Sequence, residues 1–412
     1  MALYVKKGSF ASQTSTGNQV ISFTPNAGDP AWTPKAVILW GNQLTAAGYG
    51  VGLAKFLGAA TAAGGVSAQV WDEDGLTTTN NSRKISDSSL FGMVGTDQTT
   101  LQAGGLVSFG SNTFTIDWTD AADSAWIIHY LALGGATLTN AKHGTFTSAA
   151  ATGDQSFTGV GFQPDYLLVF GNSLGSVSAS AAVNFNIGMA SSASRMGSAS
   201  IRGRDNVADT AYTTDQRTDK IISTVGSSAE TTLHVASLKT FDADGFTITF
   251  DSSSAQCYGY LALKGGSYFV GNETQPVAPG LKTTAGIGFP PRALFGMSTN
   301  ITHGTAFNTA NGKMSIFGAD AFNEGGIWVQ GADNVGNTDV DSRTVTTKAM
   351  GFSTQPSTTD AEADLSRFNS DGFTLDWTTA DATAREFIFT VFGDPEDVSI
   401  GKGRSLLLGV QS

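Results

Sequence analysis

The stretch Phe246-Thr247-Ile248-Thr249-Phe250 decides the fold class, because its apolar and polar residues alternate strictly. A period of two places the three apolar side chains on one face of a β-strand and the two threonines on the other. The same pattern returns as Phe114-Thr115-Ile116-Asp117-Trp118 and as Phe373-Thr374-Leu375-Asp376-Trp377. One half-buried strand is therefore predicted three times in the chain.

Two further markers accompany this strand. A proline followed by an apolar strand occurs at 34–40, 164–170 and 291–295, and a strand that ends in glycine occurs at 130–135, 260–266 and, more loosely, 387–393. Markers that keep their order and spacing indicate internal repeats. We expect three domains, at 1–137, 138–268 and 269–396, followed by a C-terminal arm at 397–412.

The composition favours an all-β chain. Its 412 residues include 50 glycines, and only 14% are charged, a usage typical of short strands joined by tight turns. The apolar stretch 126–133 predicts a strand covered on both faces, and 359–368 is expected to form a short helix. The predicted fold class is all-β, with three tandem β-sandwich or jelly-roll-like domains of about seven to nine strands each. Pseudo-threefold packing of these domains is one expected arrangement.

Charge and cysteine content exclude several classes. The net charge is -12 and no basic block is present, so nucleic-acid binding is not expected. The single cysteine, Cys257, cannot form an internal disulfide. The N-terminus lacks the apolar run of a signal peptide, and no stretch has the roughly 18 apolar residues of a membrane helix. We expect a chain made and folded in a cytoplasm, with no membrane partner.

The search for catalytic groups finds no candidate, and neither an enzyme nor a cofactor is expected. None of the four histidines recurs in another copy; they are His129, His143, His234 and His303. The sequence Gly171-Asn172-Ser173-Leu174-Gly175 matches a nucleophile elbow, but no helix is expected after it, so a hairpin turn is the favoured interpretation. For Asp72-Glu73-Asp74-Gly75 we favour an Asp/Asn-rich turn, with a bound cation as the alternative.

Three arginines follow short polar residues in the three copies: Arg83, Arg217 and Arg343. A guanidinium with five donors can tie down a long loop, or it can face a partner at three equivalent sites. Both interpretations stay open. Three tryptophans, Trp40, Trp118 and Trp377, are expected to fill cores rather than contact partners.

The arm at 397–412 lies outside the repeat and is partly basic. It carries Lys402 and Arg404, followed by Leu406, Leu407 and Leu408. It either folds back on the last domain as a strand or reaches a neighbouring subunit as an anchor.

The repeat also carries short motifs, which the second copy keeps best. They are Gly144-Thr145-Phe146-Thr147, Thr152-Gly153-Asp154-Gln155, Gly161-Phe162-Gln163-Pro164-Asp165, Asp244-Gly245-Phe246-Thr247-Ile248 and Tyr260-Leu261-Ala262-Leu263-Lys264. The first copy departs from them at Asn112-Thr113, and the third has lost most of its opening. The module resembles a glycine-rich repeat of bacteriophage virion proteins.

This resemblance implies a virion structural protein, made in the host cytoplasm. It implies capsid decoration or a tail-associated role, with major capsid or tail proteins as partners, and it supplies no catalytic residues. The alternative is a lectin-like tail or fibre protein that binds a host glycan or receptor, because sandwich loops often carry sugar sites. A depolymerase is a third, weaker hypothesis, since it needs paired carboxylates.

Overall fold

The structure is a computed structural model that describes residues 2–226, 232–252, 254–303, 307–308, 311–354 and 358–394. Its architecture is all-β and antiparallel, with three sheets of seven strands and three of four. Within the described residues the only helical element is one 3-10 turn, Thr96–Gln98. No described helix is long and apolar enough to cross a membrane.

The first pair of sheets is built mainly from the first 135 residues. The seven-stranded sheet has the order β1 (Leu3–Ala11), β11 (Ile127–Gly135), β3 (Pro34–Gly41), β5 (Leu53–Ala60), β6 (Val66–Asp72), β7 (Asn81–Ser86) and β15 (Ala179–Ala181). The four-stranded sheet has the order β2 (Gly17–Ser22), β10 (Thr113–Asp120), β9 (Thr100–Gly110) and β8 (Phe91–Val94).

The second and third pairs repeat this order. The second is β12 (Asn140–Thr147), β22 (Cys257–Lys264), β14 (Tyr166–Gly171), β16 (Val183–Ser192), β17 (Arg195–Gly203), β18 (Tyr212–Arg217) and β26 (Phe307–Asn308), with β13 (Gly153–Thr158), β21 (Gly245–Phe250), β20 (Thr232–Asp242) and β19 (Ile222–Val225). The third is β23 (Ser267–Thr274), β33 (Glu386–Gly393), β25 (Pro291–Ser298), β27 (Gly312–Asp320), β28 (Glu324–Gly331), β29 (Val340–Val345) and β4 (Gly48–Val51), with β24 (Gly280–Ala285), β32 (Gly372–Thr379), β31 (Thr358–Asn369) and β30 (Met350–Thr354).

The last strand of each seven-stranded sheet comes from another repeat. Strand β15 of the second repeat pairs with β7 of the first, β26 of the third pairs with β18 of the second, and β4 of the first pairs with β29 of the third. The direction is the same each time, so the exchange closes into a cycle. Each expected domain therefore gives one strand away and receives one.

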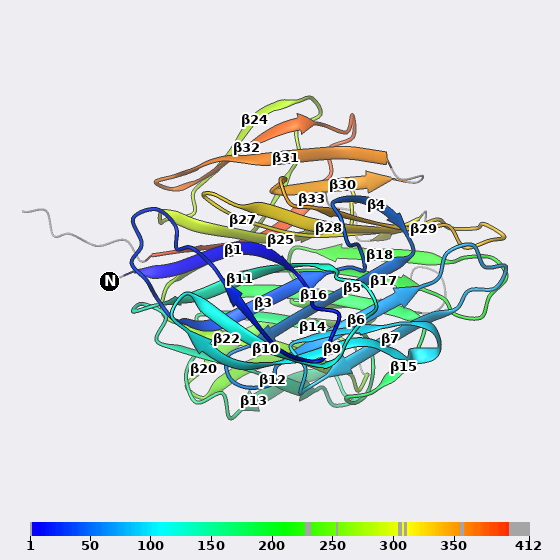
Figure 1. Ribbon diagram of the computed structural model, residues 1–412, viewed down its shortest axis with the longest axis horizontal. Coiled ribbons are helices and arrows are strands. Elements are labelled where there is room, and N and C mark those ends of the chain that lie inside the picture. Colours follow the sequence, from blue (N-terminus) through cyan, green and yellow to red (C-terminus); the bar gives the residue numbers. More distant parts are fainter. Residues whose placement is uncertain are drawn as a thin grey trace, which may run out of the picture.

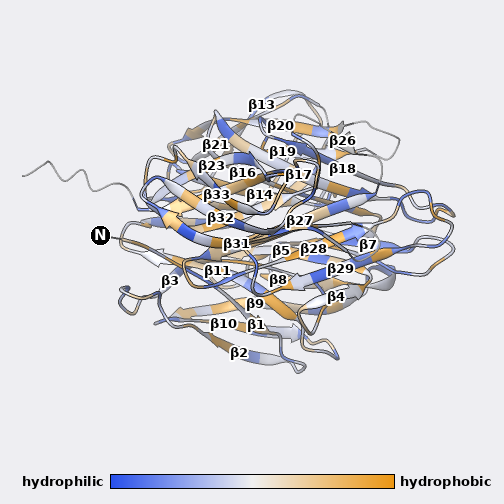
Figure 2. Cartoon of the chain, turned by 90° about the horizontal axis from the view of Figure 1, so that it is seen from above, coloured by the Kyte–Doolittle hydropathy of each residue, from blue (hydrophilic) through white to orange (hydrophobic). Residues whose placement is uncertain are grey.

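Two kinds of core hold these sheets. Each seven-stranded sheet packs on its four-stranded partner through a separate hydrophobic core. In the first repeat the centroid of the Phe91 ring lies 4.3 Å from that of Phe56 and 5.0 Å from that of Trp118. A larger core is shared by all three seven-stranded sheets, which contribute Leu57, Ile187 and Ile316 among others. The four-stranded sheets face outward: β24, β32, β31 and β30 lie at the top of Figure 1, and those of the other two repeats lie on opposite sides in Figure 2.

The structure explains two residues of the recurring motifs, the glycine of the first strand and the aspartate of the Asp-Gly turn. A Cβ atom on Gly8 would lie 2.3 Å from the Tyr130 ring, and one on Gly144 would lie 2.9 Å from the Tyr260 ring. Glycine is therefore required where the aromatic ring of the neighbouring strand crosses the first strand. The motif aspartate Asp244 accepts hydrogen bonds from backbone N–H groups of the loop after β13, and so holds this loop to the β20–β21 turn.

One predicted element is wrong. Residues 359–368 lie in strand β31, not in a helix, and β31 pairs with β30 and β32. The buried residues Ala361 and Ala363 alternate with the half-buried Glu362 and Asp364. This period of two, together with backbone partners on both sides, overrides the helix propensity of the alanines and acidic residues.

Other expectations are confirmed or revised. Strand β11 is buried along its middle seven residues, so the strand covered on both faces is confirmed. The three tryptophans expected in cores are buried, namely Trp40, Trp118 and Trp377. Each pair of sheets contains eleven strands, seven plus four, rather than about seven to nine; the exchanged strands, of two to four residues, are too short for periodicity to reveal.

Candidate functional site

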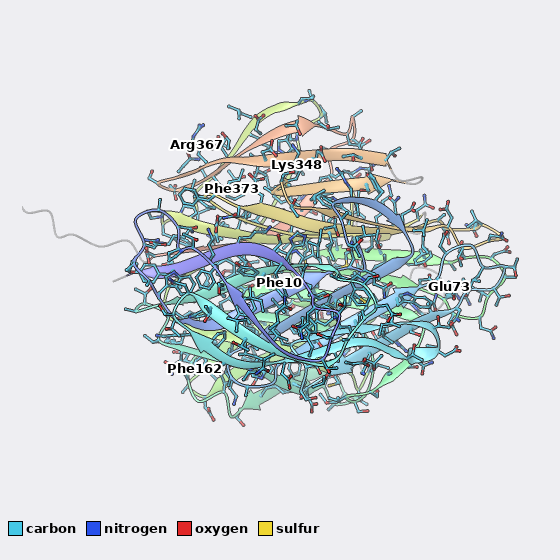
Figure 3. The ribbon with its side chains drawn as sticks, viewed as in Figure 1. Phe10, Glu73, Phe162, Lys348, Arg367 and Phe373 are labelled. Carbon is cyan, nitrogen blue, oxygen red and sulfur yellow. The ribbon has the colours of Figure 1, made fainter. Side chains whose placement is uncertain are left out.

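Three long loops lie together at one end of the molecule. They cover residues 73–80, 204–211 and 332–339, and each joins the fifth and sixth strands of a seven-stranded sheet. Figure 3 labels Glu73 in the first loop, at the end of the molecule far from the N-terminus. We call this set of loops the loop ring.

One threonine in each loop ties it to the next loop. The backbone N–H of Val207 donates to Thr79 Oγ1 at 3.1 Å, that of Val335 to Thr210 Oγ1 at 3.2 Å, and that of Leu76 to Thr338 Oγ1 at 2.7 Å. Backbone bonds of 2.7–3.1 Å flank each of these contacts. All three threonines are at most 4% exposed, so the loops are locked to one another rather than merely adjacent.

One aspartate in each loop adds a second set of contacts. The carboxylate of Asp205 accepts from the backbone N–H of Asn81, Asp333 accepts from Tyr212, and Asp74 accepts from Val340, at 2.9–3.0 Å. Each carboxylate thus caps the first residue of a strand in another repeat. A hydrogen bond to an ionised acceptor contributes about 1.5–3 kcal/mol, more than a neutral one.

The residue after each aspartate has a left-handed backbone. Gly75, Asn206 and Asn334 have φ values of +77°, +54° and +56°, a conformation that Gly and Asn adopt at lowest cost. The Asp/Asn-rich turn predicted at Asp72–Gly75 is confirmed. Among the described residues no group of three or more His, Cys, Asp or Glu side chains is placed to hold a metal ion.

A third set of contacts between repeats is made by the first strand of each repeat. The backbone N–H groups of Lys7, His143 and Val270 donate to Asp320 Oδ2, Thr61 Oγ1 and Ser191 Oγ at 2.9, 3.3 and 3.1 Å. In each case the first strand of one repeat contacts the hairpin between the fourth and fifth strands of the preceding repeat's seven-stranded sheet. These contacts again form a cycle.

The residues in the shared core differ between repeats. Lys55, Phe185 and Met314 occupy equivalent positions in β5, β16 and β27. The Lys55 ammonium lies 2.8 Å from Met314 Sδ and 4.7 Å from the centroid of the Phe185 ring, and the side chain is fully buried. Burial lowers the pKa of Lys55 well below 10.5, because desolvation penalises the charged form.

A second buried cluster joins the first and third repeats. Lys7 Nζ lies 3.4 Å from His129 Nδ1 and donates to the carbonyl oxygen of Glu324. Burial lowers the pKa of Lys7 to about 7 and raises that of the Glu324 carboxyl to about 7. Because Lys7 and His129 are at most 1% exposed, they are closed to a substrate. Sequence reasoning missed Lys7 and Lys55; a lysine inside the apolar run Leu53-Ala54-Lys55-Phe56-Leu57 was the available signal.

The three arginines do not lie in register. Arg83 is the third residue of β7, Arg217 the sixth of β18 and Arg343 the fourth of β29. Arg83 Nη1 donates to the carbonyl oxygen of Asn172 at 2.9 Å, and Arg217 Nε donates to Asp215 at 3.1 Å. Arg343 bonds Glu362 at 3.0 Å and lies 4.9 Å from the Tyr49 ring. Their role in binding a partner stays a prediction.

The remaining predicted residues lie apart from one another. His234 Nδ1 is 2.6 Å from the Tyr258 hydroxyl, and burial lowers the pKa of this histidine to about 4. Cys257 is buried. Ser173 follows the end of β14 with φ +57°, and strand β15, not a helix, comes next. The arm residues Lys402, Arg404, Leu406, Leu407 and Leu408 lie outside the described residues.

Comparison with known proteins adds no relative. No protein-family model matches the chain, and no curated protein is significantly similar to it in sequence.

Proposed function

We propose that three tandem sandwich domains form one pseudo-threefold body, and that this body is a structural component of a bacteriophage particle. The observation that carries the proposal is the closed cycle of contacts between repeats. Exchanged strands, interlocked threonines and capping aspartates all follow the order first, second, third, first. A body of this kind presents a trimer's symmetry with a single chain.

The packing around Tyr212 supports a further point, namely that the three repeats are not interchangeable in this body. The Tyr212 ring fills space left by Gly203, Gly312 and Gly331, where added Cβ atoms would approach it to 2.6–2.7 Å. Its counterparts in the other repeats are Asn81 and Val340. Three copies of any one repeat would leave a cavity or a clash here, so the chain acts as one trimer-like unit.

Such a unit suits a threefold position on a capsid shell or on a tail, where symmetric partners meet. Its partners are then the major capsid or tail proteins, and its location is the virion after synthesis in the host cytoplasm. On this proposal the protein is not an enzyme. The resemblance of its repeats to those of phage virion proteins supports the same assignment.

A host-glycan-binding role in a tail or fibre is the second candidate. The observation that favours it is a polar groove between the second and third repeats, with arginine, carboxylate, amide and hydroxyl groups.

Cryo-electron microscopy of the purified particle tests the proposal. We expect density for three related lobes around a threefold axis of the shell or tail. Purified protein is also expected to bind particles that lack it. Absence of the protein from the particle, together with failure to bind purified heads or tails, would contradict the structural role.

A further inference from the structure

The groove between the second and third repeats has a volume of about 280 Å³. One wall is the β16–β17 hairpin with Ser194 and Arg195, and the other is formed by β23 and β24 with Asn272, Glu273 and Thr284. This volume is at the lower end of small-ligand sites, and it suits one saccharide unit better than a peptide or a polymer.

The third repeat departs from the other two at this place. Strand register makes Glu273 the counterpart of Phe10 and Phe146. It likewise makes Lys282 the counterpart of Gln19 and Gln155. Lys282 Nζ lies 2.9 Å from Glu273 Oε1. An aromatic ring and an amide are thus replaced together by an ion pair in the third repeat.

Arg195 leaves this groove with one surplus positive charge. Its guanidinium lies over the Phe269 ring, 4.0 Å from the ring centroid, and a cation–π contact of this kind favours that orientation. The Phe269 ring in turn stacks on the buried Phe389, with an interplanar angle of 12°. Among the described ion pairs none includes Arg195, while Glu273 is neutralised by Lys282. The groove is lined by one arginine and one glutamate, and the glutamate is paired with Lys282, so Arg195 is left to bind an anion.

The chemistry of the groove selects its ligand. A planar guanidinium recognises a carboxylate through two parallel hydrogen bonds. The neutral groups around it include the hydroxyls of Ser194, Thr218 and Thr284. They match the hydroxyl groups of a sugar ring. One positive charge is too few for a phosphate dianion, which Arg clusters usually bind.

We propose that this groove binds a saccharide unit that carries a carboxylate, such as a uronic or a sialic acid. Arg195 holds the carboxylate, and Ser194, Thr218 and Thr284 bind hydroxyl groups. Within the part of the chain that the structure describes, the site belongs to the third repeat and its contact with the second, and the proposal does not depend on how the protein attaches to a particle.

Titration calorimetry of the full chain tests this proposal, with glucuronic acid and N-acetylneuraminic acid as probes. Glucose, acetate and phosphate are the comparison ligands. We expect at least one acidic sugar to bind, and Arg195→Gln to weaken binding roughly ten- to a hundredfold, as expected for loss of a charge-assisted hydrogen bond. Arg367→Gln is the matched control, since this exposed arginine on β31 bonds Asn369 at 3.1 Å, on another part of the third repeat.

Three results would overturn the proposal. They are no binding of either acidic sugar at about 10 mM, a concentration that detects even weak sites, equal binding of acetate or phosphate, and unchanged binding by Arg195→Gln. Thermal unfolding at the wild-type temperature shows that this variant is folded. Attachment of Arg195→Gln to particles is expected to be unchanged, so failure of the sugar site and failure of the structural role give different results.

Discussion

The ring of Tyr212 lies against Gly331 of the third repeat, where an added Cβ atom would come within 2.6 Å of it. The two residues come from different repeats, and Tyr212 belongs to the core that the three seven-stranded sheets share. A large side chain in one repeat is therefore matched by a missing side chain in another.

Gly331→Val is expected to destabilise the protein by about 1–3 kcal/mol, the usual cost of overpacking a core. Combining it with Tyr212→Ala should cost less than the sum of the two single changes, because the new side chain occupies the space of the lost ring. Thermal or denaturant unfolding measures both. Gly336→Val is the control, since nothing lies within 4 Å of its Cβ position; additive single effects would contradict the contact.

Lys55→Met is expected to stabilise the protein, because the wild-type chain must bury an ammonium or deprotonate it. The folded pKa lies well below 10.5, so the unfolded state binds more protons. Wild-type stability therefore rises with pH through the range between the folded pKa and 10.5. The advantage of Lys55→Met should shrink there by up to about 1.4 kcal/mol per pH unit.

Denaturant unfolding of both proteins from about pH 8 to about pH 10 measures this difference, just below the ordinary titration range of lysine. The comparison cancels the titration of groups that both proteins share. A stability difference that stays constant over this pH range would contradict a neutral Lys55.

Each threonine of the loop ring is expected to contribute about equally. Thr79→Val, Thr210→Val and Thr338→Val each remove a buried acceptor and leave one backbone N–H unsatisfied, at a cost of about 1–3 kcal/mol. Thr78→Val, on the exposed part of the first loop, should change stability by less than about 0.5 kcal/mol. Chemical denaturation measures all four, and a small effect at one buried threonine alone would show that the ring does not close there.

The whole chain is expected to unfold in one transition. Each junction between repeats combines an exchanged strand, a loop contact and a shared core, so no repeat can lose its structure alone. Calorimetric and van't Hoff enthalpies should then agree. A separate fragment 138–268 is expected to expose its part of the shared core and to bind a hydrophobic dye. Three resolved transitions would contradict this cooperativity.

Much of the fold could be read from periodicity. The Phe246–Phe250 pattern lies in β21 as expected, and the buried strand at 126–133 lies in β11. The helix expected at 359–368 failed because strand pairing outweighs local propensity. Strand register makes Ile388 the counterpart of His129 in the third repeat, so this histidine does not recur there.

The sites were less accessible to sequence reasoning. The arginines Arg83, Arg217 and Arg343 seemed equivalent by spacing, yet their positions in β7, β18 and β29 differ. No sequence pattern distinguishes the threonines of the loop ring, because each is a lone threonine in a polar loop. Their importance comes from contacts with residues more than 120 positions away.

Many of the strands can be recognised in the sequence, because alternation of apolar and polar side chains is a local property. The sequence by itself also determined the repeat, because three ordered markers need no structure to be recognised. Only the tertiary structure decided which strand completes which sheet, that Lys55 is buried beside Phe185 and Met314, and that Glu273 and Arg195 share a groove. The physical reason is that these contacts join distant parts of the chain, and no local pattern records them.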